Sequence, residues 1–128
     1  MVFGLFKKTP KLEVTFTPTI AVARELGKEV EVAGDLVMRN VGKDAELTDL
    51  ETVLVAGGTR RIDLDLPPTW RGAQRIPAGG ELRTAAAWTV ALAAPPMRAP
   101  AAQIQINTAA GGKRAPLCLS NKFPLANE

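Results

Sequence analysis

The sequence predicts an all-β protein, a single antiparallel β-sandwich of about seven to nine strands with an immunoglobulin-like arrangement. Three observations lead to this prediction. Apolar and polar residues alternate with a period of two in several runs, most clearly in residues 12–17 and 61–66. No apolar stripe with a helical spacing of 3.6 residues is sustained anywhere. Turn signals built from glycine, proline and asparagine recur every 8–14 residues, which is typical of short strands in a sandwich.

The first two expected strands cover residues 12–22 and 29–40, with a turn at 27–28 between them. Pro18 interrupts the first strand, and we expect the chain to bend there and cross from one sheet to the other. Gly34 lies in the middle of the second strand, which predicts a bulge or a close backbone approach. The apolar side chains of the second strand share one face: Val30, Val32, Leu36 and Met38.

A turn at residues 40–43 precedes a third strand over 46–56, although its first part, 44–50, also fits one turn of helix. The strand over 61–66 follows a glycine pair and is stopped by Pro67 and Pro68. Residues 67–80 are then expected to form a long loop that contains Trp70.

The longest alternating run covers residues 82–92, where small neighbours surround Trp88 and predict that its ring anchors the core. A proline-rich loop over 94–100 leads to two further strands, 103–107 and 117–119, and then to a polar tail. We expect one domain over residues 1–128, in which residues 1–10 form a short apolar and then basic lead segment.

The composition excludes several kinds of chemistry. The chain has no histidine, so a Ser–His or Cys–His couple and a histidine-ligated zinc ion are impossible. The single cysteine, Cys118, excludes an intrachain disulfide and a site with two cysteine ligands. Its apolar surroundings predict a small core residue. We therefore expect no enzymatic activity and no cofactor.

The charged residues favour neither nucleic-acid binding nor metal binding. The net charge is +3, and the seven basic residues of the 67–128 region are spread out, with only 5% aromatic residues in the chain. Nucleic-acid binding is therefore not expected. The only dense acidic set gives the only candidate metal ligands, for calcium. Its spacing matches no EF-hand loop, and we expect the solvated face of a strand. The set comprises Asp44, Glu46, Asp49 and Glu51.

No apolar run approaches the roughly 18 residues that a spanning helix needs, and a cytoplasmic location is expected, in agreement with a single cysteine. The lead segment allows two interpretations. Phe3, Leu5 and Phe6, followed by two lysines, would suit a small peripheral contact with a membrane surface. We favour the alternative that these side chains pack on the domain.

Trp70 is the candidate binding residue, together with Arg71 and Arg75. An aromatic residue in a loop, flanked by prolines and arginine, has the composition of a contact hot spot. Equally, its ring could fold back over an open end of the sandwich. A further alternative is a small-ligand or carbohydrate module that uses Trp70 as a stacking platform, although the loop supplies Arg71 and Gln74 but no acid.

Several features in order carry a resemblance to a known family. They are Phe6-Lys7-Lys8, the stretch 32–36, the strand 49–55, the loop 76–81 and the Trp88 strand followed by Pro95-Pro96. In this order the chain resembles the arrestin-like β-sandwich, and specifically one of the two domains of the bacterial sporulation-control proteins. The resemblance implies no catalytic residues. It implies a scaffold that binds other proteins through sheet edges and loops.

We therefore expect a non-enzymatic domain that binds another protein, or a second copy of itself, by pairing an exposed edge strand. Residues 12–17 and 117–119 are the expected edges, and few charges protect the second.

Overall fold

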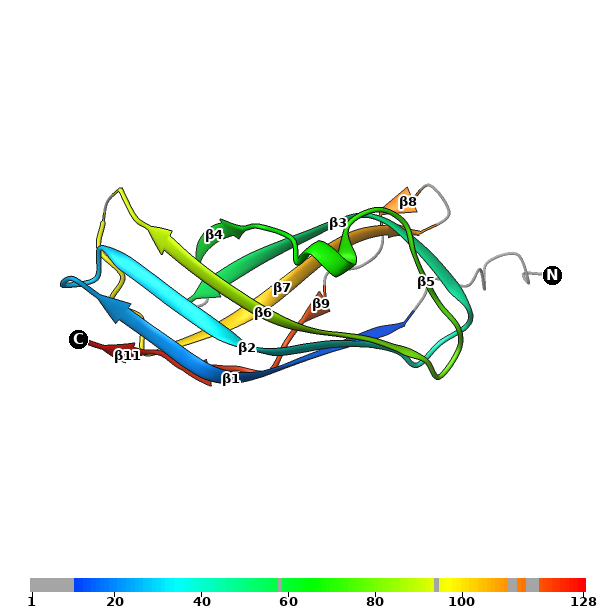
Figure 1. Cartoon of the computed structure of the whole chain (residues 1–128), viewed down its shortest axis with the longest axis horizontal. Helices are drawn as coiled ribbons and strands as arrows, with labels where there is room; N and C mark the ends of the chain where they lie inside the picture. Colours follow the sequence, from blue (N-terminus) through cyan, green and yellow to red (C-terminus); the bar gives the residue numbers. More distant parts are fainter. Residues whose placement is uncertain (1–10, 58, 94, 111–112, 115–117) are drawn as a thin grey trace.

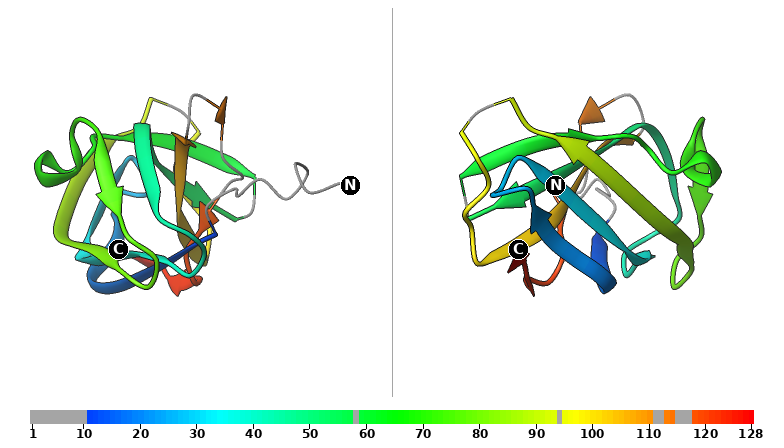
Figure 2. Two further views of the ribbon diagram at one scale, coloured as in Figure 1. Left: turned by 90° about the vertical axis from the view of Figure 1, so that its right-hand side faces the viewer. Right: turned by 60° about the vertical axis from the view of Figure 1, so that its left-hand side comes forward.

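Two β-sheets pack face to face in the computed structural model, which describes residues 11–57, 59–93, 95–110, 113–114 and 118–128 (Figure 1). Figure 2 shows the two layers from two other sides. Sheet A has the strand order β11-β1-β2-β6, and sheet B has the order β10-β7-β3-β4, with β5 beside β3 and with β8 and β9 beside β7. The all-β sandwich predicted from the sequence is confirmed, and the described residues contain no α-helix.

The strands differ greatly in length. Sheet A consists of β1 (Leu12–Arg24), β2 (Glu29–Asn40), β6 (Glu81–Ala91) and β11 (Ala126–Asn127). Sheet B consists of β3 (Ala45–Ala56), β4 (Arg60–Leu64), β5 (Gln74–Ile76), β7 (Ala101–Ala110), β8 (Lys113–Arg114), β9 (Cys118–Leu119) and β10 (Phe123–Pro124). Neighbouring strands are antiparallel except β1 and β11, which pair in parallel at Val22 and Ala23.

The core lies between the inner faces of the two sheets. The predicted apolar face of β2 is buried, because alternate residues of a strand point to the same side of the sheet. Trp88 on β6 is also buried, and its ring lies 6.1 Å from that of Phe16. The ring of Phe123, on β10, lies 5.1 Å from that of Phe16. The prediction that Trp88 belongs to the core is confirmed.

Pro18 does not move the chain from one sheet to the other, so this expectation is wrong. β1 stays paired with β2 on both sides of the proline, and the register shifts between Pro18 and Ile20. The bulge lies opposite Gly34, where a Cβ atom would come within 2.2 Å of the Thr17 carbonyl oxygen. The close backbone approach predicted at Gly34 is therefore confirmed, and the bulge absorbs the proline within one sheet.

β3 is a strand over its whole length, so the alternative of a helical turn over residues 44–50 is wrong. The local pattern that suggested a helix has a different origin. Asp49 has a φ angle of +54°, and the register of β3 against β7 shifts between Thr48 and Glu51. An irregularity of this kind displaces the apolar residues from strict alternation.

Residues 118–128, which we call the closing segment, join the two sheets along one side of the sandwich. β9 and β10 pair with β7 in sheet B, and β11 pairs with β1 in sheet A (Figure 1). Between them, the Asn121 side chain accepts from the Phe16 N–H (2.9 Å) and donates to the Phe16 C=O (3.0 Å). Phe123 and Leu125 are buried, so the expected polar tail is wrong: two-residue strands are too short to give a readable alternation.

Residues 1–10, with the candidate membrane contacts Phe3, Leu5 and Phe6, lie outside the described residues. In the described ranges, no helix has the length and apolar character that crossing a membrane requires.

Candidate functional site: the cleft beside β6

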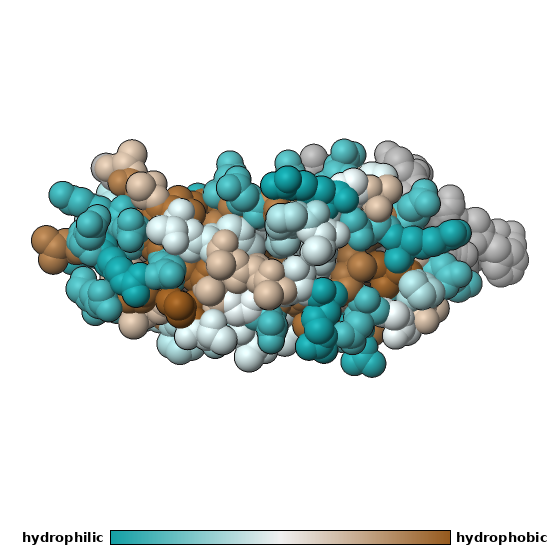
Figure 3. Space-filling view, in the orientation of Figure 1, coloured by the Kyte–Doolittle hydropathy of each residue, from teal (hydrophilic) through white to brown (hydrophobic). Residues whose placement is uncertain are grey.

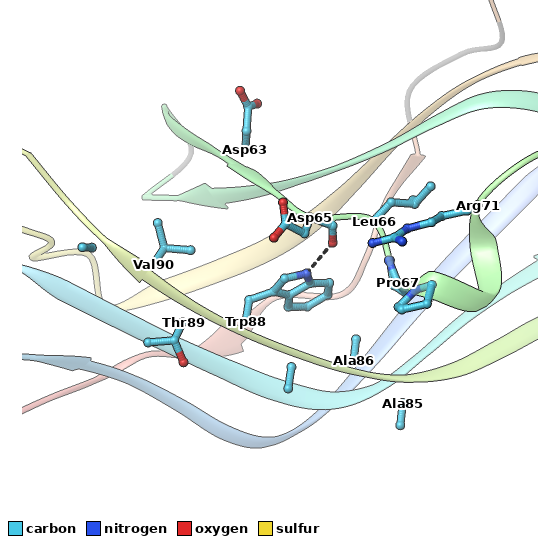
Figure 4. Close-up of a pocket in the computed structure, with 13 residues that line it drawn as sticks. Asp63, Asp65, Leu66, Pro67, Arg71, Ala85, Ala86, Trp88, Thr89 and Val90 are labelled. Carbon is cyan, nitrogen blue, oxygen red and sulfur yellow. Dashed lines mark hydrogen bonds between the residues drawn. The ribbon is translucent and has the colours of Figure 1, made fainter.

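The side of the sandwich opposite the closing segment is open. β6 is the last strand of sheet A and β4 the last strand of sheet B there, and no hydrogen bond pairs the two strands within the described part of the chain. A cleft of about 550 Å³ lies between them (Figure 4), a volume in the range of ligand-binding pockets. One wall is formed by residues 85–91 of β6, and the other by Asp63, Asp65, Leu66, Pro67, Pro68 and Arg71.

The ladder between β2 and β6 determines which backbone groups of β6 face the cleft. In an antiparallel pair, every second residue exchanges hydrogen bonds with its partner, and the residues between point their N–H and C=O groups the other way. The Leu92 N–H donates to the Lys28 C=O (2.8 Å), and the Asn40 N–H donates to the Gly80 C=O (2.9 Å). The register between β2 and β6 is continuous from the Lys28–Leu92 pair to the Asn40–Gly80 pair. The even-numbered residues of β6 therefore bond to β2, and the odd-numbered residues point outward.

The outward groups belong to Ala85, Ala87, Thr89 and Ala91. Apart from a hydrogen bond of 3.1 Å that the Thr84 hydroxyl donates to the Ala85 C=O, they have no protein partner in the described part of the chain. Exposed edges are usually protected by charge, proline or a bulge. β6 has none of these between Thr84 and Ala91. In Figure 3 the middle of this face, over β6, is neutral to weakly hydrophobic between polar flanks.

Trp88 forms the floor of the cleft. Its side chain is 7% exposed, and the indole N–H donates to the Asp65 C=O across the cleft (2.7 Å), as the dashed line in Figure 4 indicates. Nearby, the Thr69 hydroxyl donates to the Thr84 hydroxyl (3.0 Å). These two side-chain bonds tie the segment after β4 to β6, and the indole bond fixes the orientation of the Trp88 ring.

Among the described residues, three charged side chains line the cleft: Asp63, Asp65 and Arg71. In Figure 4 both aspartates come from the β4 side: the Asp63 carboxylate points away from the Trp88 ring, the Asp65 carboxylate lies closer to it, and the Arg71 guanidinium lies beside Pro67. All three residues are exposed, and none takes part in an ion pair in the described ranges. The cleft therefore has a mainly negative rim above an apolar floor.

Trp70 is only 1% exposed, so the interpretation of its ring as a partner contact or a sugar-stacking platform is wrong. The loop contains a 3-10 helix, η2 (Pro68–Trp70), in which the Trp70 N–H donates to the Pro67 C=O (2.9 Å). This turn directs the ring into the core. Arg71, immediately after it, lines the cleft, whereas Arg75 lies exposed on β5 and does not.

The acidic set along β3 does not converge. Asp44 accepts a hydrogen bond from the Ala78 N–H (2.8 Å), which ties the start of β3 to the loop before β6. Glu46, Asp49 and Glu51 are exposed, and the irregularity at Asp49 separates side chains that a regular strand would align. In the part of the chain that the structure describes, no three acidic or cysteine side chains gather so as to hold a metal ion.

Cys118 lies in the core, as expected from its apolar surroundings, and burial raises the pKa of its thiol. Among the described strands, the expected edge at residues 12–17 has one neighbour, β2, and its Phe16 backbone bonds to the Asn121 amide. β9, part of the expected edge at 117–119, pairs only with β7 among the described strands; residue 117 lies outside the described residues.

Sequence reasoning missed the cleft, with Asp63, Asp65 and the edge of β6. One signal was present: residues 84–92 contain no charge, and their outward positions carry small side chains. A central strand would also tolerate such a run. The pattern therefore predicts a strand but does not reveal that one of its edges is open.

Two packed sheets with this topology form a β-sandwich, and the resemblance to the sporulation-control proteins drawn from the sequence is confirmed as a likeness of fold. Spo0M, a sporulation control protein from Bacillus subtilis, matches with a TM-score of 0.53 and 14% identity over 91% of this chain and 49% of its own, so this chain spans about half of Spo0M. The putative ApaA protein from Bordetella pertussis matches with a TM-score of 0.54 and 15% identity over 94% of this chain and 96% of its own.

A Northeast Structural Genomics Consortium target, SoR45, matches with a TM-score of 0.51 and 9% identity over 92% of this chain and 86% of its own. No family model and no curated protein matches the sequence. At these identities the comparisons establish the fold.

Proposed function

We propose that this protein is a non-enzymatic, cytoplasmic binding domain that takes up an extended segment of another protein along the free edge of β6. The observation that supports the proposal is the row of outward backbone groups from Ala85 to Ala91, which faces a cleft instead of a neighbouring strand. Strand addition uses such groups: the backbone bonds supply affinity, and alternate side chains supply specificity.

The dimensions of the site suit this mode of binding. Seven residues of β6 line the cleft, a length of about 20 Å in an extended strand. An added strand would bond to the N–H and C=O groups of up to four outward residues, each bond contributing about 0.5–1.5 kcal/mol net. Ordering the segment and losing its translational freedom oppose this gain. We therefore expect moderate affinity, suited to reversible association.

The alternation of bonding directions along β6 provides a sharp test. The Thr89 N–H points toward the cleft, so Thr89→Pro removes a donor from the free edge without removing a bond to β2. Thr89→Val changes the same side chain but keeps the N–H, and it serves as the matched control. Thermal melting followed by circular dichroism establishes that both variants fold.

The readout is affinity purification after crosslinking, in which the wild-type, Thr89→Pro and Thr89→Val proteins each serve as bait. We expect a set of partners that wild type and Thr89→Val share and that Thr89→Pro loses. If a folded Thr89→Pro protein captures the same partners to the same extent, the edge of β6 is not the binding surface.

A further inference from the structure

We infer that the segment bound along β6 is basic, with a lysine or arginine side chain that reaches Asp63 and Asp65. This inference rests on the proposed function and deepens it, because it names the chemistry of the partner. Two carboxylates and a single guanidinium line the cleft, and in the described ranges none of the three is neutralised by an ion pair. Charge complementarity therefore favours a cationic occupant.

The position of the carboxylates agrees with the geometry of an added strand. Alternate side chains of that strand would point toward the floor of the cleft, where Trp88 and Ala86 lie. Beyond the floor lies the β4 rim, the side of the cleft that carries Asp63 and Asp65 (Figure 4). A lysine or arginine at such a position can lay its methylene groups across the indole and place its charge at the rim. An acidic side chain would find Arg71 as the one cation in the described lining of the cleft, because Arg60 and Arg61 of β4 lie outside it.

A second copy of this chain fits the cleft less well. Antiparallel pairing of β6 with β6 of another molecule is symmetric and would bring the two β4 rims toward each other. Asp63 and Asp65 of both copies would then face one another, and like charges repel. The same rim that attracts a basic segment thus disfavours self-association at this edge.

The experiment is a selection from a displayed library of random twelve-residue peptides on the wild-type protein. We expect the selected peptides to be rich in lysine and arginine and poor in acidic residues. Replacing one of their basic residues with glutamine should weaken binding up to about fivefold, the range of an exposed ion pair, and the difference should shrink as salt is added.

Variants of the protein test whether Asp63 and Asp65 cause the preference for basic peptides. The double variant Asp63→Asn/Asp65→Asn should bind the selected peptides about two- to tenfold more weakly and bind the glutamine versions as wild type does. Glu13→Gln/Glu51→Gln makes the same change in net charge at two exposed positions outside the cleft, and it should bind like wild type. Thr89→Pro should lose the basic and the glutamine peptides alike.

The outcomes separate the inference from the proposed function. Peptides without a charge preference, but still lost by Thr89→Pro, would overturn the inference and leave the proposed function standing. Equal binding by wild type and Thr89→Pro, or a selection that enriches no peptide, would overturn both. A dimer in sedimentation experiments that Thr89→Pro dissociates would identify a second copy as the occupant and overturn the inference.

Discussion

Replacing Trp70 with alanine should destabilise the protein about as much as replacing Trp88, contrary to what the sequence alone suggests. Trp70 is 1% exposed and Trp88 is 7% exposed, although only Trp88 belongs to an alternating strand. A buried tryptophan removes roughly 150–250 Å² from water. At about 25 cal/mol per Å², this area corresponds to about 4–6 kcal/mol as an upper estimate. Measured tryptophan-to-alanine costs in protein cores are about 3–5 kcal/mol.

We therefore expect each alanine variant to lose about 3–5 kcal/mol of unfolding free energy, a large share of the 5–15 kcal/mol of a typical domain. Trp88→Ala also loses the hydrogen bond from the indole to the Asp65 C=O, worth about 1 kcal/mol. Water that enters from the open cleft can offset part of the cavity left there. The two costs should thus agree within about 1–2 kcal/mol.

Equilibrium urea unfolding followed by far-ultraviolet circular dichroism measures both costs without relying on tryptophan fluorescence. Trp70→Phe and Trp88→Phe are the controls, since they retain an aromatic ring and should lose less. If Trp70→Ala cost less than about 1 kcal/mol, the ring would not be a core residue, and the placement of the loop between β4 and β5 would be refuted.

Three further predictions concern other parts of the fold. Gly34→Ala should cost at least about 1–3 kcal/mol in urea unfolding, because its Cβ would lie 2.2 Å from the Thr17 carbonyl oxygen; an unchanged midpoint would contradict the close approach. Asn121→Ala should cost about 1–3 kcal/mol, and the Phe16 amide should exchange faster with deuterium because it loses its acceptor; unaltered exchange would argue against the bond. Because burial raises the pKa of Cys118, its thiol should stay protonated at pH 8 and react with iodoacetamide at least about tenfold more slowly in the native protein than in urea; equal rates would contradict its burial.

The fold could be predicted from the sequence where the pattern is local. Val30 and Val32 of β2, like Ala86 and Trp88 of β6, lie two residues apart and face the same side, so alternation reveals both strands and their buried faces. The close backbone approach at Gly34, opposite the bulge, could also be predicted, because a glycine inside a strand usually marks such an approach.

The remaining features depend on which segments meet in space. The burial of Trp70 follows from a turn at η2 that sets the direction of a single side chain, and no periodicity reports it. The short strands of the closing segment are defined by their partners β7 and β1 and not by their own residues. The candidate site combines Asp65 with β6, and only the strand order shows that none of the described strands lies between them.

The closing segment has a consequence for how the chain folds during synthesis. Asn121 completes the hydrogen bonding of Phe16, which precedes it by 105 positions. At about 5–20 residues per second, a ribosome needs about 5–20 s to produce the intervening chain. Throughout that interval the edge of β1 lacks the segment that later covers it, and the edge of β7 lacks it from the synthesis of residue 110 until β9 and β10 have been made. Both edges can pair with a neighbouring nascent chain during this time, so the risk of aggregation should be greatest before the last strands have been made.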